Sequence, residues 1–564
     1  MFYLKIAWHN LKHSIDQYIP FLLASLLLYS LTCSTLLILM SAVGRDMGTA
    51  ATVLFLGVIV LSIFAVVMEH YSYNILMKQR SSEFGLYNIL GMNKRQVARV
   101  ASLELFIIYI FLISIGSLFS AFFAKFIYLI FVNIINYHAL NLSLSLWPFI
   151  ICIVIFTGIF LTLEVPVIRH VHLSSPLSLF RKKQQGEKEP KGNLILAILA
   201  LVAIAIAYTM ALTSGKAPAL AVIYRFFFAV LLVIAGTYLF YISFMTWYLK
   251  RLRQNKHYYY KSEHFVSTSQ MIFRMKQNAV GLASITLLAV MALVTIATTV
   301  SLYSNTQNVV TGLFPKSVSL SIDNSKGDSR LKKINLLGNK FDVVKNLKEA
   351  YVPETTNTYN PGLIIFANNK QIDNIRKAYL PYTKNINTFP KTFKAYLDLN
   401  SQEINSISKN DIIEVDGKYV GNISTKQSFL KEGYQMFGGL LFTGFLLGIS
   451  FLLGIALIVY YKQYSEGHED KRSYRILQEV GMSKKLVKRT INSQIMIFFF
   501  QPLVVAVIHF GVAIPMLKQM LLVFGVLNST IVYVVSGLTV LAISIIYFII
   551  YRITSRTYYH IIER

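Results

Sequence analysis

Residues 21–40 read FLLASLLLYSLTCSTLLILM, a run that contains no charged side chain. A helix rises about 1.5 Å per residue, so about 20 such residues cross a hydrocarbon layer about 30 Å thick. The run is too long for the apolar region of a secretory signal peptide, and no small-residue cleavage site with convincing flanks follows it. We therefore predict that it is a retained transmembrane helix.

Similar apolar runs recur along the chain. Of its 564 residues, 55% are apolar and 14% are charged, and the mean hydropathy is +0.54. These values lie outside the range of soluble globular proteins. The sequence predicts an all-α polytopic membrane protein with about ten transmembrane helices, at residues 18–43, 51–69, 104–133, 145–168, 193–213, 221–248, 279–302, 434–461, 491–516 and 526–551.

Basic residues indicate how these helices are oriented in the membrane. The net charge is +28. If the N-terminus is cytoplasmic, the basic residues of the short loops lie mainly on the cytoplasmic side, as the positive-inside rule requires. The short outer loops and their edges then hold only Arg45, Lys216, Arg225 and Lys518. We therefore expect both termini to be cytoplasmic. Since the charge is spread over loops near the membrane and forms no compact basic domain, membrane lipids are expected partners and nucleic acid is not.

A polar stretch at residues 303–433 is long enough to fold as a small domain, and the charge distribution places it outside the cell. Residues 317–322 alternate like a strand, residues 363–366 form a short apolar run, and residues 371–382 have helical spacing. An Asp-Gly pair within residues 411–420 predicts a hairpin. The expected domain is therefore α+β.

Composition also marks a linker between membrane units. Residues 184–191 read QQGEKEPK, a polar and charged segment with Gly and Pro that is typical of a solvated linker. The expected organisation is a first membrane unit with helices 1–4 at residues 1–168, a cytoplasmic linker at 169–192, helices 5–7 at 193–302, the extracellular domain at 303–433 and a second membrane unit with helices 8–10 at 434–564.

An internal repeat relates the two membrane units. Residues 83–99 read EFGLYNILGMNKRQVAR, and residues 473–489 read SYRILQEVGMSKKLVKR. Each copy precedes another apolar run, so two related units have been separated by an insertion. At a constant offset the identical pairs are Gly91 with Gly481, Met92 with Met482, Lys94 with Lys484, Val97 with Val487, and Arg99 with Arg489.

Each copy predicts a short cytoplasmic helix followed by a sharp turn and a basic helix. Glycine just past a helix end tolerates positive φ, and Asn93 or Ser483 can cap the next helix. An ordinary surface connection would have the same local pattern, but the duplication favours docking of a soluble partner. The candidate docking residues are Glu83, Leu86, Leu90, Gly91, Met92, Arg472, Ile476, Leu477, Gly481 and Met482.

Motifs for catalysis are poor, so we predict no enzyme activity, no catalytic residue and no cofactor or metal in this chain. The G-x-x-x-x-G-K-[ST] pattern that cradles ATP phosphates does not occur, and GKA at residues 215–217 lacks the magnesium-binding hydroxyl. HEDKR at residues 468–472 lacks the second histidine of a zinc site. His170 and His172 stand at a membrane edge, where interfacial residues are commoner than ligands. The substrate-binding residues are unknown at this level.

Three charged residues lie within or beside apolar runs. Lys125 can extend its ammonium group towards the membrane surface, and Glu104 and Glu164 lie near cytoplasmic ends of their helices. Deep burial of a charge is costly, so we expect these residues to anchor helix edges rather than bind substrate. Glu164 together with Pro166 is also consistent with a bend.

The motifs resemble those of the FtsX-like permease family, and more closely the bacitracin-export type of permease for antimicrobial-peptide resistance. Residues 83–92 are similar to the first cytoplasmic motif of that family. FRMKQNAVGLA at residues 273–283 resembles the start of its seventh helix, and residues 469–472 with Gly481 and Met482 are similar to its second motif. Residues 303–433 are shorter than the extracellular domain of that type.

The resemblance implies an ABC transporter in the bacterial cytoplasmic membrane that removes or detoxifies envelope-active antimicrobial peptides such as bacitracin. It implies a separate ABC ATPase subunit, acting as a dimer, that binds ATP and Mg. It further implies a membrane sensor histidine kinase as partner, and as substrate an antimicrobial peptide or a peptide-bound lipid-linked wall precursor.

Two other functions remain open. One is export of a lipid, lipoprotein or small toxic compound by a similar architecture. The other is a mechanotransmitting or signalling scaffold that carries ATPase strokes to a wall enzyme or a histidine kinase, with no substrate crossing the membrane.

Overall fold

The computed structural model describes residues 2–41, 44, 48–137, 142, 144–173, 193–216, 219–259, 262–313, 317–323, 351–352, 363–364, 392–397, 412–415, 418–479, 484–526 and 529–563. The chain divides into two compact units. Unit 1 comprises Met1–Tyr303, Met436–Val523 and Ser529–Arg564, and unit 2 comprises Ser304–Gln435 and Phe524–Asn528.

The predicted membrane spans are confirmed in number and order, and with them the all-α polytopic fold class. Each expected run overlaps most of a helix that is long and apolar enough to cross a membrane, and the bounds differ by a few residues. Among the described residues, ten helices meet this condition, over Gln17–Leu39, Ala50–Gln79, Lys94–Ile134, Trp147–Val167, Leu194–Leu212, Ala221–Gln254, Ala279–Ser304, Lys426–Tyr464, Phe499–Val523 and Thr530–Arg556.

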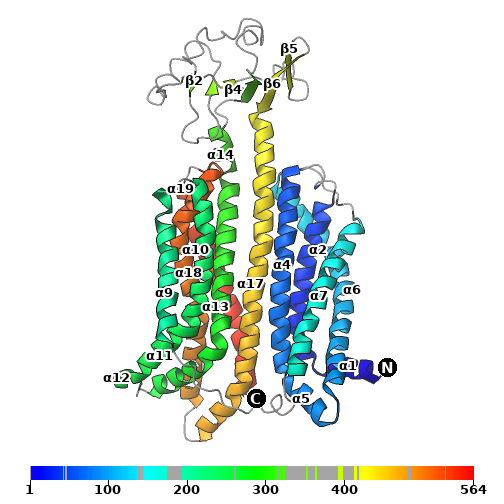
Figure 1. The fold of residues 1–564 in the computed structure, drawn as a ribbon, viewed down its shortest axis with the longest axis vertical. Coiled ribbons are helices and arrows are strands. Elements are labelled where there is room, and N and C mark those ends of the chain that lie inside the picture. Colours follow the sequence, from blue (N-terminus) through cyan, green and yellow to red (C-terminus); the bar gives the residue numbers. More distant parts are fainter. Residues whose placement is uncertain are drawn as a thin grey trace. The chain divides into compact units, whose positions relative to one another are not determined.

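The first group of helices in unit 1 comes from the N-terminal part of the chain and is blue to cyan in Figure 1. Helix α2 packs against four neighbours, α1, α4, α6 and α7, so it lies at the centre of the group. The members are α1 (Phe2–His13), α2 (Ile15–Leu39), α4 (Gly48–Gln79), α5 (Ser81–Ile89), α6 (Lys94–Ile134) and α7 (Trp147–Leu173).

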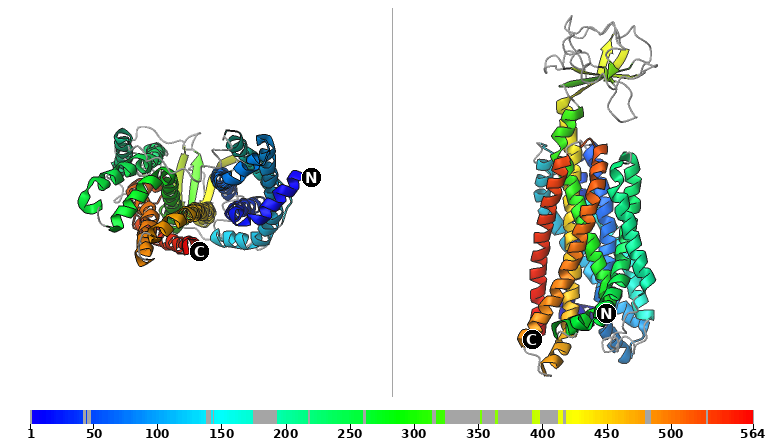
Figure 2. Two further views of the ribbon diagram at one scale, coloured as in Figure 1. Left: turned by 90° about the horizontal axis from the view of Figure 1, so that it is seen from below. Right: turned by 90° about the vertical axis from the view of Figure 1, so that its left-hand side faces the viewer.

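The second group combines helices from the middle of the chain with the two C-terminal helices, and Figures 1 and 2 show it on the opposite flank of unit 1. Within it, α9, α10 and α18 pack against one another. The members are α9 (Leu194–Leu212), η1 (Ser214–Lys216), α10 (Ala219–Leu239), the π-helix η2 (Phe240–Phe244), α11 (Met245–Gln254), α12 (Lys256–Tyr259), α13 (Ser262–Ser304), α18 (Lys484–Val523) and α19 (Ser529–Glu563).

The long helix α17 (Lys426–Glu479) runs between the two groups (Figure 1). Aromatic rings join it to the first group, since Phe451 lies 5.0 Å from Phe64 of α4 between ring centroids. Small residues bring it close to the second group, because a Cβ on Gly444 would lie 2.5 Å from Oγ1 of Thr299 on α13. Buried side chains from α2, α4, α6, α7, α13, α17, α18 and α19 form one continuous apolar core.

Unit 2 contains a mixed sheet with the strand order β2-β3-β4-β1-β6-β5. The strand predicted at 317–322 is confirmed, and so is the hairpin at 411–420, because β5 pairs with β6 in antiparallel orientation. Residues 371–382, predicted to be helical, lie outside the described residues. The elements are α14 (Thr306–Leu313), β1 (Val318–Asp323), β2 (Tyr351–Val352), β3 (Leu363–Ile364), β4 (Thr392–Leu397), β5 (Ile412–Val415) and β6 (Lys418–Thr425).

The positions of the two termini agree with the number of candidate spans found among the described residues. An even number of candidate spans separates them, and Figure 1 shows both ends of the chain at the same end of unit 1. Among the described residues, the seventh candidate span ends at Ser304, where unit 2 begins. Which side is cytoplasmic remains a prediction. The finer division at residues 168, 192 and 302 also remains a prediction, and residues 174–192 of the linker are not described.

Candidate functional site

The first copy of the repeat forms the predicted short helix and sharp turn. Helix α5 ends at Ile89, and Gly91 has φ of +101°. The N–H of Met92 donates to the carbonyl of Tyr87 at 3.0 Å, and the N–H of Gly91 donates to that of Asn88 at 3.2 Å. These two hydrogen bonds define a Schellman motif, which satisfies carbonyls left free at the helix end. The positive φ expected at this glycine is therefore confirmed.

The following helix is capped as the sequence predicts. The side chain of Asn93 accepts a hydrogen bond from the N–H of Gln96 at 3.0 Å. The Gln96 side chain accepts one from the N–H of Asn93 at 2.9 Å, which completes a capping box. The turn between α5 and α6 is thus fixed on both sides by local hydrogen bonds.

Helix α5 has one buried face and one exposed apolar face. Phe84 is fully buried, whereas Leu86, Ile89 and Leu90 are 45%, 57% and 73% exposed. Positions three and four residues apart lie on the same face of a helix, so these three side chains form one stripe. We call Leu86, Ile89 and Leu90 the α5 stripe. It lies outside the candidate spans, so its exposure is not explained by contact with hydrocarbon.

The other candidate residues of this copy have different surroundings. Met92 is partly buried and packs against the apolar core, so it supports the turn rather than the stripe. Glu83 forms an ion pair with Arg80, with 3.0 Å between Oε2 and Nε. Ile89 was not among the predicted docking residues, although its spacing from Leu86 was sufficient to identify it.

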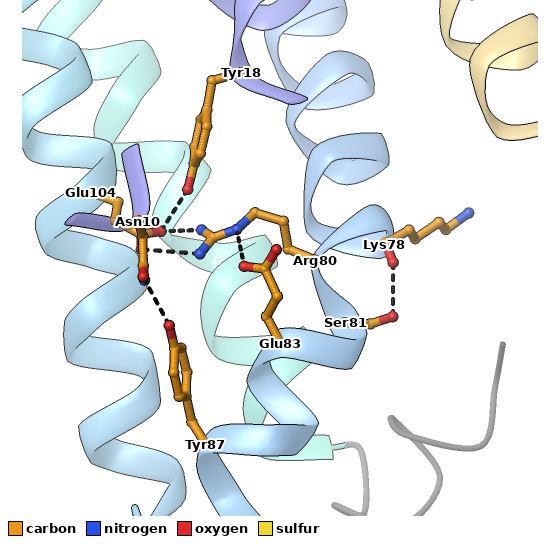
Figure 3. Close-up of polar contacts among 8 residues, drawn as sticks. All are labelled: Asn10, Tyr18, Lys78, Arg80, Ser81, Glu83, Tyr87 and Glu104. Atoms are coloured by element: carbon orange, nitrogen blue, oxygen red, sulfur yellow. Dashed lines mark hydrogen bonds and ion pairs between the residues drawn. The ribbon is translucent and has the colours of Figure 1, made fainter. Parts of the chain in front are cut away.

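Beneath α5 lies a buried polar network that sequence reasoning did not predict (Figure 3). Arg80, the residue that joins α4 to α5, is 1% exposed, and Glu104 of α6 is 2% exposed. Their side chains form a bidentate ion pair, in which Nη2 of Arg80 lies 3.1 Å from Oε1 of Glu104 and Nη1 contacts Oε2. The expectation that Glu104 anchors a helix edge is wrong, because this carboxylate is buried among Asn10 of α1, Tyr18 of α2 and Arg80 at the start of α5.

Two neutral groups complete the hydrogen bonds of Glu104. The amide of Asn10 on α1 donates to Oε1 at 2.7 Å, and the hydroxyl of Tyr18 on α2 donates to Oε2 at 2.9 Å. With the two guanidinium contacts, the carboxylate accepts four hydrogen bonds, which is its full capacity. Tyr87 of α5 in turn donates to Oδ1 of Asn10 at 2.8 Å. The network therefore ties α5 to α1, α2 and α6.

The guanidinium of Arg80 remains charged in this setting. Burial alone would lower the pKa of Arg80, but the charge of Glu104, with contributions from Tyr18 and Glu83, holds it above its ordinary value. The guanidinium also lies 5.1 Å from the ring centroid of Tyr18 and 4.9 Å from that of Phe84. These cation–π contacts add to the ion pair. The start of α5 is thereby held in one position.

The second copy of the repeat differs from the first. No separate short helix precedes its turn in the described residues, since α17 continues without a break to Glu479 and α18 begins at Lys484. The expectation of a short helix in this copy is therefore wrong. The residues aligned with Arg80 and Glu104 are Asp470 and Gln494, so the ion pair that fixes the bend after α4 cannot form here.

Several predicted positions have no described side chain. Arg472, Ile476 and Leu477 lie within α17, but their side chains are outside the described residues, and Gly481 and Met482 are outside them altogether. The side chains of His170, His172 and His468 are likewise not described. Among the described residues no group of His, Cys, Asp and Glu has the arrangement of a metal site.

The other two charged residues near apolar runs are placed as follows. Glu164 of α7 accepts a hydrogen bond from Ser102 of α6 at 2.6 Å. Lys125 is exposed on α6. Neither takes part in the network around Glu104. Of the three charged residues that the sequence singled out near apolar runs, only Glu104 therefore belongs to this network.

Comparison with known proteins supports the resemblance seen in the motifs. Residues 51–171, which include α5, α6 and most of α4 and α7, match the family described as FtsX-like permease C-terminal. The match contains Arg80, Glu104 and the α5 stripe. The resemblance of this part of the chain to FtsX-like permeases is therefore confirmed.

Similar proteins occur among bacterial permeases. The chain is 21% identical over 521 residues to the ABC transporter permease protein YxdM of Bacillus subtilis strain 168, which covers 79% of this chain and 82% of that protein. It is 27% identical over 256 residues to the bacitracin export permease protein BceB of the same organism, covering 44% and 39% of the two chains. With BceB of Halalkalibacterium halodurans it shares 26% over 231 residues, covering 40% and 36%.

Proposed function

We propose that this chain, an ABC transporter permease of the FtsX type, removes or detoxifies antimicrobial peptides that act on the bacterial envelope. Two of the similar proteins are named for bacitracin export. The proposed substrate is an antimicrobial peptide, free or bound to a lipid-linked wall precursor. Energy comes from the hydrolysis of ATP, bound with Mg in a separate ATPase subunit that works as a dimer. A membrane histidine kinase is a further proposed partner.

The observation that carries the coupling mechanism is the α5 stripe. Three apolar side chains are exposed on a helix outside the candidate spans, and the helix is held from beneath by the Arg80–Glu104 pair. A few apolar anchors carry most of the binding energy of a protein interface. We infer that the ATPase receives these anchors in a groove and that its movement is passed through α5 to α4 and α6.

We propose that the termini and both copies of the repeat face the cytoplasm and that unit 2 lies on the outer face. Cysteines introduced by Ser325→Cys and Ser473→Cys in separate variants test it. In intact cells an impermeant thiol reagent is expected to label the Ser325→Cys variant and not the Ser473→Cys variant. Wild-type chain is the control for the native cysteines, which are both buried. The reverse labelling pattern would refute the orientation.

The proposed function is tested by deletion of the gene and complementation. The deletion strain is expected to become sensitive to some members of a panel of peptide antibiotics, and wild-type permease should restore resistance. A Leu86→Asp, Leu90→Asp variant should not, because a charged carboxylate cannot replace an apolar anchor. Loss of one such anchor costs about 2 kcal/mol or more, so ATPase co-purification should fall by more than about tenfold.

A Leu86→Met, Leu90→Met variant is the matched control, because it keeps the stripe apolar. It should retain resistance and ATPase binding. Normal ATPase binding by the aspartate variant would show that the stripe is not the docking element. Unchanged peptide susceptibility of the deletion strain would instead remove the peptide substrate from the proposal.

One observation favours the scaffold as a second candidate function. Helix α17 continues without a break from the end of β6 to Glu479, so a movement at one end can be passed along it without a substrate pathway. Co-purification with a wall hydrolase, together with unchanged peptide susceptibility after deletion, would support this candidate over transport.

A further inference from the structure

A second buried carboxyl group, Glu69 of α4, lies within a candidate span and is fully buried. Its contacts differ from those of Glu104. Within the described residues no ion pair involves Glu69, and its Oε1 has no hydrogen-bond partner. The side chain that contacts it is Ser25 of α2, whose Oγ lies 2.7 Å from Oε2. Ionised carboxylates buried in this way are very costly unless they are paired.

The hydrogen count at Ser25 favours a protonated Glu69. Oγ of Ser25 lies 2.7 Å from Glu69 and also 2.9 Å from the carbonyl oxygen of Phe21. A hydroxyl has one hydrogen to donate, and a backbone carbonyl can only accept. If Ser25 donates to Phe21, the short contact with Glu69 needs a hydrogen from the carboxyl group. A protonated Glu69 that donates to Ser25 satisfies both contacts, whereas an ionised Glu69 leaves one of them without a hydrogen.

Glu69 stands where α4 meets α17 as well as α2. Close by on α4, Ser72 donates a hydrogen bond to the hydroxyl of Tyr461 on α17 at 3.2 Å. Met68, the residue before Glu69, has the end of its side chain beside Gly454 of α17, where a Cβ would lie 3.0 Å from it. Among the described residues, Ser25 of α2 and Tyr461 of α17 interact with Glu69. Of these two, Tyr461 is titratable through its phenol.

We propose that Glu69 is a proton-binding site that holds α17 against α2 and α4, and that the proton is released when this packing opens. The neutral acid fits the packed junction, because it donates to Ser25 and brings no charge into the apolar core. The carboxylate does not fit, since it would need donors that the junction does not supply. The opening of the junction to water is therefore linked to the loss of a proton.

This junction joins the helices that lead to the two copies of the repeat. Helix α4 continues through Arg80 into α5, and α17 continues to Glu479 at the second copy. The ATP-driven movement of one copy relative to the other would thus pass through a contact that binds a proton. A packed state that binds more protons than the open state is weakened as the pH rises.

The amide replacement distinguishes a neutral carboxyl group from an ionised one. Glu69→Gln keeps the size and the hydrogen-bond donor of the neutral acid, so at mildly acidic pH the purified full-length variant should melt at the wild-type temperature. Glu104→Gln is the matched control, because Glu104 accepts four hydrogen bonds as a carboxylate, and this variant should melt well below wild type. Infrared spectra of the wild type should show the carbonyl stretch of a protonated carboxyl group that is missing in Glu69→Gln and kept in Glu104→Gln.

The pH dependence tests the link to packing. The melting temperature of the wild type should fall from mildly acidic to alkaline pH by more than that of Glu69→Gln, and this difference isolates the proton on Glu69. Equal pH dependence of the two proteins would overturn the link. A Glu69→Gln variant that fails to fold or melts as low as Glu104→Gln, or an infrared band that survives in it, would show that Glu69 is not the protonated group.

Discussion

Replacement of Glu104 by Gln is expected to destabilise the first group of helices by about 3–5 kcal/mol, the usual cost of breaking a buried ion pair from one side. The buried charge on Arg80 would keep only Glu83, which is partly exposed, as its counter-charge. An amide also offers only one oxygen, so it cannot accept all four hydrogen bonds. The melting temperature of the purified permease and the amount recovered from membranes measure the effect.

The loss of stability depends on which group of the Arg80–Glu104 network remains buried without its partner. A Tyr87→Phe variant removes only the neutral hydrogen bond to Asn10, so it should cost about 1 kcal/mol. An Arg80→Met, Glu104→Leu double variant removes both charges and should recover much of the lost stability, because apolar replacements of a buried pair are often tolerated. If Glu104→Gln were as stable as wild type, the network could not be what holds α5.

Replacement of Gly91 by Val is expected to abolish peptide resistance while the permease still reaches the membrane. At φ of +101° a β-branched side chain is strained by about 1–3 kcal/mol, so the turn after α5 should change its course. The α5 stripe would then be aimed differently at the ATPase. Co-purification of the ATPase and the peptide susceptibility of complemented cells measure the result.

Gly158 of α7 provides a matched control for this variant. A Cβ would meet nothing within 4 Å at either glycine, and only Gly91 has a positive φ. Gly158→Val should therefore keep ATPase binding and resistance, which separates backbone strain from added bulk. A Gly91→Val, Gly481→Val double variant extends the test to the second copy. Full resistance in that double variant would mean that both repeats are surface connections only.

The sequence by itself determined the features that depend on neighbouring residues. Long uncharged runs such as residues 21–40 identified the ten spans, because crossing hydrocarbon requires only length and apolar composition. The turn at Gly91 and the cap at Asn93 were also predictable, since a positive φ and a capping box involve side chains and N–H groups a few residues apart. The hairpin of β5 and β6 followed from its local Asp-Gly signal in the same way.

Only the tertiary structure decided which buried polar groups meet. Arg80 is 24 positions from Glu104, and Ser25 is 44 positions from Glu69, so no local pattern connects them. The sequence placed Glu104 at a helix edge, whereas packing of α1, α2 and α5 around α6 buries it. The same packing gives the carboxylate of Glu104 four hydrogen-bond donors and leaves the carboxyl group of Glu69 with the hydroxyl of Ser25. The stability of a charged group in a low-dielectric interior depends on such contacts, because each missing hydrogen-bond partner costs more free energy there than in water.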